Sequence, residues 1–373
     1  MNMKVVLERN AFLEALAIAG NVVEKKNTMP ILGHVLLTAE ANGLSIKATD
    51  LDISYVDAIP SKVEDAGKVA APAHLLLDIV RKLPEEQLIT LEQNGNQLIV
   101  TSGASRFNLA VLSGDDFPSI GSGEDFPVRF SLKAWELRYL LDKTRFAMST
   151  EETRYNLNGI CLHVAEHEGG VVLRAAATDS HRLACAHIAV PNGAEKMPSI
   201  IIARKTVLEL SKFLERYEGD VSISLSSFQI CLRMGNALIS SRLIDGTFPD
   251  YECLIPYEND NVLIADRKSF LEAVDRVSLI SFDRMRPIKM RIQGDQVELS
   301  APSSEFGSAK ETLDVSYGHE QIDIGFNSRY LMDLSQLSDS DKIEIRLKDA
   351  STAALVCDAG DASSLTVLMP MRV

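Results

Sequence analysis

An internal repeat constrains this fold more than any other feature, because one pattern of helices and hairpins occurs three times along the chain. Each copy opens with a pair of large side chains four residues apart, which places both on one face of a helix. The pairs are Phe12 with Leu16, Trp135 with Tyr139, and Phe270 with Val274. A second helix is predicted in each copy. The six predicted helices span residues 9–26, 73–86, 132–146, 203–216, 266–280 and 328–337.

The segments between the predicted helices alternate apolar and polar residues and are divided by Gly, Asn and Asp turns. Stretches such as "NQLIVTSGASRFNLAVL" and "FQICLRMGNALISSRLI" are typical of antiparallel hairpins. The sequence therefore predicts an α+β fold of three repeated domains, each with two helices packed on antiparallel sheets of about eight strands. We place the domains at residues 1–121, 128–256 and 261–373, with linkers at Ser119–Pro127 and Tyr257–Asn261.

The composition indicates a globular protein of a reducing compartment. A length of 373 residues favours two or three domains. The five cysteines form no C-x-x-C motif, so we interpret them as buried apolar residues rather than disulfides. The N-terminus lacks a signal-peptide pattern, and no run approaches the roughly 18 apolar residues that a membrane helix needs. We expect a cytoplasmic protein that binds no membrane.

The formal charge of −14 argues at first against nucleic acid, but the charge is unevenly distributed. The six predicted helices hold 17 basic and 13 acidic residues, whereas the remaining chain holds 21 basic and 39 acidic residues. If the helices line one surface, that surface can face phosphate groups. A simpler explanation is that Lys and Arg favour solvated helix faces.

The chain ends on "VLMPMRV", an apolar strip where a frayed polar end is usual. If this strip is extended, Leu365, Val367, Met369, Met371 and Val373 share one face. Methionine adapts its shape to different neighbours, and Pro370 lacks the N–H that would continue a strand ladder. The strip is either a last core strand or one wall of a binding site.

Several motifs give the chain a family resemblance over essentially its whole length. They are "MPILGHVLL", "TDLDISY", "ATDSHRLA", "GTFPDYECLIP" and the terminal "MPMRV". In order and spacing they resemble the bacterial replicative sliding clamp, the beta subunit of DNA polymerase III. The resemblance implies a head-to-tail homodimer that closes into a ring of six domains. Helices would face duplex DNA in that ring, and the chain would tether partners without being an enzyme.

The resemblance also assigns residues to three surfaces. Short peptides from polymerases, the clamp loader ATPase and repair proteins would dock in a hydrophobic pocket between the second and third domains. Its residues are Leu157, Thr178, His181, Arg182, Leu183, Pro249, Leu254, Val367, Met369, Pro370, Met371 and Arg372. Lys26, Tyr155, Arg204 and Lys205 would face the DNA without reading its sequence. Phe107, Leu109, Leu279 and Ile280 would form the dimer interface.

Two positions depart from the family pattern. Ser180 occupies a place where the family often has Gly, so the loop there would differ if it requires a positive φ. Cys253 precedes Leu254 where well-known members carry a basic residue. A contact from that position to a peptide carboxylate is therefore not expected here.

Other motifs resemble parts of catalytic, metal-binding or nucleotide-binding sites, but each lacks a feature that such a site requires. Ser180 and His181 are adjacent, so in an extended chain they point to opposite faces and cannot act as nucleophile and base. His163 and His167 lie in a predicted hairpin without H-E-x-x-H, so we expect turn histidines and no metal site. "GSGEDF" fails the dinucleotide motif and no phosphate loop occurs, so no cofactor is expected and ring opening should need an external ATPase. Two alternative functions remain for this chain: a hydrolase, and a peptide-binding scaffold that does not encircle DNA.

Overall fold

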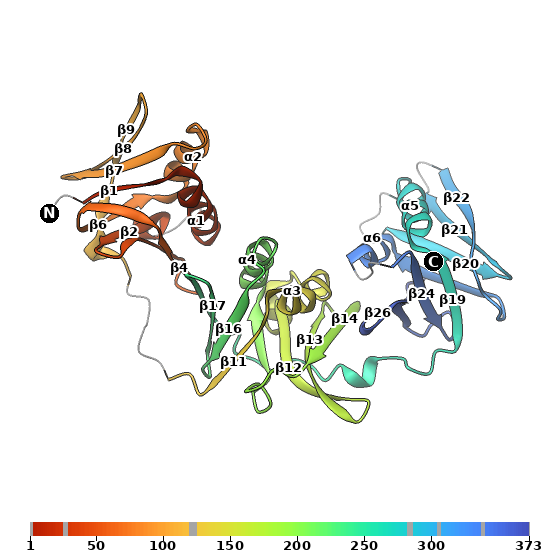
Figure 1. Ribbon diagram of the computed structural model, residues 1–373. Coiled ribbons are helices and arrows are strands. Elements are labelled where there is room, and N and C mark those ends of the chain that lie inside the picture. The colour runs from red at the N-terminus through yellow and green to blue at the C-terminus, as the bar shows by residue number, and fades with distance from the viewer. Residues whose placement is uncertain are drawn as a thin grey trace. The chain divides into compact units, whose positions relative to one another are not determined.

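The computed structural model describes residues 3–24, 29–118, 125–281, 286–303, 307–336 and 340–372 (Figure 1). The chain divides into two compact units. The first contains Met1–Leu137, Pro191–Ala194 and Leu208–Leu243, and the second contains Arg138–Val190, Glu195–Val207 and Ile244–Val373. Three sequence repeats give two units because sheets continue across the repeat boundaries, where β4 pairs with β18 and β14 pairs with β26.

The first unit contains two antiparallel sheets. The five-stranded sheet has the order β5 (Ser61–Asp65), β1 (Lys4–Glu8), β7 (Leu88–Asn94), β8 (Gln97–Ser102), β9 (Ser105–Ala110). The nine-stranded sheet has the order β10 (Leu112–Ser113), β6 (Gly67–Pro72), β2 (His34–Glu40), β3 (Gly43–Thr49), β4 (Ile53–Ile59), β18 (Ala237–Arg242), β17 (Gln229–Met234), β16 (Asp220–Leu225), β11 (Val128–Lys133). The two hairpins quoted from the sequence are confirmed as β8–β9 and β17–β18.

The second unit also contains two antiparallel sheets. The eight-stranded sheet has the order β15 (Ile200–Ala203), β12 (Gly159–His167), β13 (Gly170–Thr178), β14 (Arg182–Ala189), β26 (Asp361–Leu368), β25 (Ala354–Asp358), β24 (Lys342–Leu347), β19 (Asn261–Asp266). The four-stranded sheet has the order β22 (Gly307–Asp314), β21 (Gln296–Ser303), β20 (Pro287–Gln293), β23 (Ile322–Asn327). Because β14 and β26 are adjacent, the loop before β14 and the end of the chain lie on the same sheet.

All six predicted helices are present, and each is shorter than its predicted window. They are α1 (Arg9–Val22), α2 (Ala73–Lys82), α3 (Ala134–Asp142), α4 (Arg204–Leu214), α5 (Arg267–Ser278) and α6 (Ser328–Asp333). Helix α2 ends before Pro84 because a residue that precedes proline disfavours helical geometry, and Leu83 is extended. Helix α1 packs against α2, β3 and β4, and α5 packs against α6, β21 and β22.

Six short 3₁₀ helices connect the larger elements in the described part of the chain. They are η1 (Pro30–Gly33), η2 (Gly114–Asp116), η3 (Arg145–Ala147), η4 (Glu152–Leu157), η5 (Glu252–Leu254) and η6 (Leu334–Gln336). No described helix combines the length and apolar character needed to cross a membrane.

The first aromatic residue of the repeated helix pattern differs in exposure between the three copies. The fourth residue of α1 is Phe12 and that of α5 is Phe270, and both are fully buried. In α3 the fourth residue is Leu137, which is buried, whereas Trp135 is 65% exposed. Trp135 lies two positions earlier, about 200° around the helix from Leu137, and so points to solvent. The Trp135 and Tyr139 pair therefore lies on a helix, as predicted, and Leu137 takes the core position that Phe12 and Phe270 occupy in the other copies.

The predicted linker at Tyr257–Asn261 is attached to the third repeat rather than free. The Asn259 side chain is buried, and its Nδ2 donates to the carbonyl oxygens of Arg346 at 3.0 Å and Ala353 at 2.9 Å. Strand β19 already begins at Asn261. Residues 119–124 of the other predicted linker lie outside the described residues.

Candidate functional site

Apolar side chains cluster in the second unit where β14 pairs with β26. Leu183 on β14 lies directly opposite Val367 on β26, and both are buried. We call this group the junction cluster; its buried members are Ala176, Leu183, Cys185, Tyr251, Ile255, Leu355 and Val367. Two predicted pocket residues that are far apart in the sequence therefore meet across one strand pair.

The end of the chain is partly core strand and partly exposed surface. Strand β26 ends at Leu368, which is buried in the core of the third repeat, on the side opposite Val367. The end of β26 is therefore buried on both faces, with Val367 in the junction cluster and Leu368 on the other side. Met369 is 48% exposed. The Met369 N–H donates to the His181 carbonyl oxygen at 3.0 Å, and the Met371 N–H donates to the Gly325 carbonyl oxygen at 2.7 Å. We call Met369–Arg372 the tail.

The β13–β14 loop is held in a tight turn by its own side chains. Thr178 Oγ1 donates to the Arg182 carbonyl oxygen at 2.7 Å, and Asp179 Oδ1 accepts from the N–H groups of His181 and Arg182. Ser180 has a φ of +75°, a conformation that glycine adopts without strain. The loop thus keeps the positive φ despite the departure from Gly, and the surrounding hydrogen bonds offset the cost.

The same turn occurs between β3 and β4 of the first unit. The two repeats therefore share not only their elements but also the hydrogen bonds of this loop. Thr49 Oγ1 donates to the Ile53 carbonyl oxygen at 3.0 Å, and Asp50 Oδ1 accepts from two N–H groups that follow it. Leu51 takes the place of Ser180, with a φ of +84°. The motifs "TDLDI" and "TDSHR" therefore encode one loop structure.

Arg182 links the loop to the third repeat. Its Nε donates to the Asp179 carboxylate at 3.1 Å, and its Nη1 and Nη2 donate to the Asp333 carboxylate and the Phe146 carbonyl oxygen. Its guanidinium also lies over the Tyr330 ring, 4.4 Å from the centroid. Arg182 therefore positions the loop rather than being free for a ligand.

Tyr330 is a residue of this surface that the sequence analysis missed. Its ring stacks on His181, with centroids 6.4 Å apart and planes 23° apart. Burial, followed by the nearby Asp179 charge, raises the pKa of Tyr330, so its hydroxyl stays protonated at neutral pH. Helix α6 was predicted, but only the tertiary structure places it beside residue 181.

Replacement of Arg182 with Ala is expected to destabilise the second unit. The change leaves Asp179 and a backbone carbonyl without their partner in a largely buried site, while Asp333 stays partly solvated, for a cost of about 2–4 kcal/mol. Thermal unfolding should show a midpoint several degrees lower. Arg154→Ala is the matched control, because Arg154 bonds Glu151 and Ser180 at the exposed rim of the same loop, where such a pair contributes about 1 kcal/mol or less. Equal midpoints for the two variants would contradict the positioning role.

The remaining predicted pocket residues lie on three connected segments. Leu157 is buried at the end of η4, and Pro249 is exposed. Leu254 is 60% exposed at the end of η5. Asn156 Nδ2 donates to the Thr247 carbonyl oxygen at 3.0 Å, which joins the η4 segment to the one containing Pro249. Phe248, which the sequence analysis missed, packs against the junction cluster.

Of the four residues predicted to face DNA, three lie in the described part of the chain. Tyr155 is exposed on η4, while Arg204 and Lys205 are half-buried in the first turn of α4. The Arg204 N–H donates to the Asn158 carbonyl oxygen at 2.8 Å, which fixes the start of α4 beside η4. Lys26 lies outside the described residues.

The predicted dimer residues differ in exposure. Phe107 on β9 is partly exposed, and Leu279 after α5 is 71% exposed. Leu109 is buried within its own chain, and Ile280 packs partly against the core of the third repeat. Exposure therefore favours Phe107 and Leu279 as the positions at which to test an interface.

The side chains that the sequence suggested for catalysis or metal binding form hydrogen bonds with other protein groups. The Ser180 hydroxyl accepts from Arg154 Nη1 at 2.7 Å, and the Asp179 carboxylate binds Arg182 and backbone N–H groups. His163 is half-buried in β12, with its Nε2 3.1 Å from the Tyr251 hydroxyl, so the expectation of a turn histidine is wrong. Burial and the Arg174 charge lower the pKa of His163. The described residues contain no cluster of three or more His, Cys, Asp or Glu that could hold a metal ion.

Comparison with known proteins identifies the family. Models of the N-terminal, central and C-terminal domains of the DNA polymerase III beta subunit match residues 3–121, 131–250 and 252–372. Beta sliding clamps of Caulobacter vibrioides and Pseudomonas putida are 41% and 34% identical, over the full length of each chain. A crystal structure of the Bartonella birtlesii sliding clamp bound to griselimycin has a TM-score of 0.96 at 45% identity, with both chains fully covered. The chain therefore belongs to the DNA polymerase III beta subunit family, the sliding clamps that act as processivity factors in bacterial DNA replication.

Proposed function

We propose that partner proteins of this clamp dock short apolar peptides on the surface formed by the junction cluster, the tail, the β13–β14 loop and the η5 segment. The observation that carries this proposal is Met369, which lies half-exposed beside His181, two residues after the buried Val367. An adaptable methionine at the edge of a packed apolar cluster suits partners with different side chains. Crystals of the Bartonella birtlesii and Pseudomonas aeruginosa clamps with griselimycin support a ligand-binding surface on this fold.

We also propose how the chain is organised as a clamp. The three domains span residues 1–121, 128–256 and 261–373, and a separate family model matches most of each domain. Two chains associate head to tail into a ring around duplex DNA, with Phe107, Leu109, Leu279 and Ile280 at the interface. The chain itself catalyses no reaction, and it works in the cytoplasm, where the duplex and the clamp loader ATPase are available.

Sequence-independent contact with phosphates would let such a ring slide. Tyr155, Arg204 and Lys205 support this role, because two cations and an exposed aromatic side chain lie on the adjoining segments η4 and α4. Lys26 completes the proposed set. The chain's net charge of −14 reduces stray binding of nucleic acid.

Retention on circular DNA tests the clamp function directly. Clamp loaded by its loader on a nicked circular duplex should stay bound through gel filtration in moderate salt, because a closed ring leaves only over a free end. Cutting the circle with a restriction enzyme should release it. An Arg204→Glu, Lys205→Glu variant should load or remain less well, equally on unrelated sequences. Equal retention of wild type on circular and linear DNA would instead favour the alternative, a peptide-binding scaffold that does not encircle DNA.

A further inference from the structure

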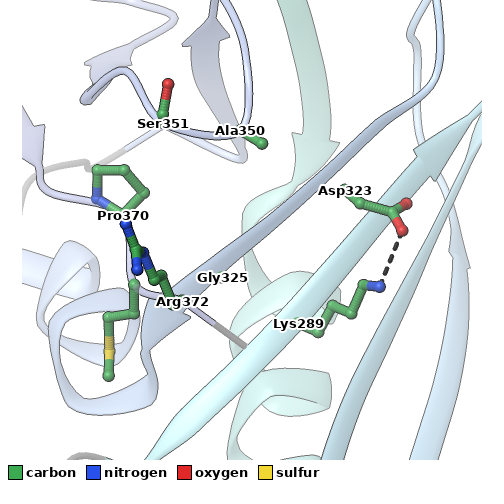
Figure 2. Close-up of a pocket in the computed structure, with 8 residues that line it drawn as sticks. Lys289, Asp323, Gly325, Ala350, Ser351, Pro370 and Arg372 are labelled. Atoms are coloured by element: carbon green, nitrogen blue, oxygen red, sulfur yellow. Dashed lines mark ion pairs between the residues drawn. The ribbon is translucent and has the colours of Figure 1, made fainter.

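A hollow of about 610 Å³ opens beside the tail, on the third repeat (Figure 2). Its lining includes Lys289 on β20, Asp323 on β23, Ser351 in the loop before β25, and Pro370 and Arg372 of the tail. We call it the tail hollow. Its volume lies within the range of sites that hold small ligands or peptide side chains.

The ionised groups of the tail hollow favour an anion. Asp323 is already neutralised, because Lys289 Nζ lies 2.8 Å and Arg291 Nε 3.2 Å from its carboxylate. These two cations lower the pKa of Asp323 to about 2. Arg372 is exposed and, among the described residues, has no ion-pair partner within 4 Å. The lining therefore contains two cationic side chains, Lys289 and Arg372, and one carboxylate, Asp323, in a chain of net charge −14.

The rim of the hollow is fixed before any ligand binds. Asp349 accepts from the backbone N–H and hydroxyl of both Ser351 and Thr352, at 2.8–2.9 Å. On the other side, the Met371 N–H bonds the Gly325 carbonyl oxygen and holds the tail against β23. A site that is ordered in advance loses less entropy on binding.

The hollow is continuous with the proposed docking surface. Pro370, Met371 and Arg372 line it, and Met369 belongs to the docking surface on the same four-residue tail. Three residues of extended chain span at most about 11 Å. A peptide bound across Met369 therefore reaches the hollow within a few residues.

We propose that the tail hollow binds a carboxylate side chain, Asp or Glu, that flanks the apolar residues of a docked peptide, with Arg372 and Lys289 as its partners. This inference rests on the proposed docking surface and specifies which peptides it prefers. Arg372 offers a guanidinium that can bind a carboxylate through two N–H groups. Lys289 can also bind a peptide carboxylate, because Arg291 forms a second ion pair with Asp323.

Two matched peptides test the proposal by fluorescence anisotropy. The acidic probe is fluorescein–Asp-Asp-Ser-Leu-Ser-Leu-Phe-amide, and the neutral probe has Asn-Asn in place of Asp-Asp. A second pair carries the same residues after the apolar segment, so that either peptide direction is covered. Wild type should bind one acidic probe about 3- to 10-fold more tightly than its neutral match at 50 mM salt, and the preference should shrink at high salt. The chain's net negative charge repels the acidic probe more than the neutral one, so nonspecific electrostatics cannot produce this preference.

Three variants assign the preference to the hollow. Arg372→Gln and Lys289→Gln should each reduce the preference below about 2-fold. Because Arg372 is also part of the docking surface, the readout is the ratio of the acidic-probe affinity to the neutral-probe affinity in each variant, and not either affinity alone. Lys342→Gln, on β24 and not in the lining, removes the same charge and should keep the preference. Equal binding of acidic and neutral probes by wild type, or an unchanged preference in Arg372→Gln, would overturn this inference alone. If wild type binds no probe, the docking surface is wrong and this inference falls with it.

Discussion

Removal of Met369–Val373 is expected to abolish binding of the acidic and neutral probes while the dimer and the fold remain. A short apolar peptide typically binds at micromolar affinity, about −8 kcal/mol. The deletion takes away two methionine side chains, each of which contributes about 1.5–3 kcal/mol when a ligand buries it. The dissociation constant should therefore rise by more than about 100-fold, beyond the range of an anisotropy titration.

The fold should tolerate this deletion because the truncated chain keeps its core. Val367 and Leu368 remain, and they are the last side chains fully buried in their clusters. Among described residues the backbone loses two hydrogen bonds, those from Met369 to His181 and from Met371 to Gly325. Circular dichroism and sedimentation should match wild type. Normal peptide binding by the truncated protein would show that the tail is only the end of a core strand. If the deletion unfolds the chain, the double variant Met369→Lys, Met371→Lys applies the same test.

Replacement of Leu279 with Asp is expected to convert the dimer into monomers and to end retention on circular DNA. Leu279 is 71% exposed, so the carboxylate is solvated in the free chain and the fold is unaffected. In the proposed seam it would be buried without a partner, at several kcal/mol. A ring of two chains contains this seam twice. A cost of about 3 kcal/mol for each seam corresponds to more than about 100-fold weaker association.

Sedimentation velocity gives the readout, since one chain has a mass of 40.9 kDa. The control is Val171→Asp, which puts the same carboxylate on another exposed apolar residue, at the β12–β13 hairpin. That variant should remain dimeric and stay on nicked circles. Ile280→Asp is a poorer probe, because Ile280 also packs against its own core and the change would confound folding with assembly. A dimeric Leu279→Asp protein would remove this residue from the interface.

The sequence by itself determined the features that depend on local pattern. Three copies of a helix and hairpin pattern predicted six helices, the β8–β9 and β17–β18 hairpins and antiparallel sheets, because side-chain periodicity and turn residues act within a few positions. The motif "TDSHR" likewise encodes its own loop, since Thr178 and Asp179 bond to residues within four positions. Even Pro370 has a local effect, and β26 ends two residues before it.

Only the tertiary structure decided which of these elements meet. The sequence pairs Trp135 with Tyr139 on one helix face, but only the structure shows that Trp135 is exposed while Leu137 faces the core. Tyr330 and Asp333 belong to a helix that the sequence predicted, but their contacts with His181 and Arg182 join positions about 150 residues apart. The tail hollow combines β20, β23, the loop before β25 and the tail, and no sequence window contains all four. Strand pairing across repeats brings His181 and Arg182 to the third repeat, because backbone hydrogen bonds between β14 and β26 do not depend on sequence separation.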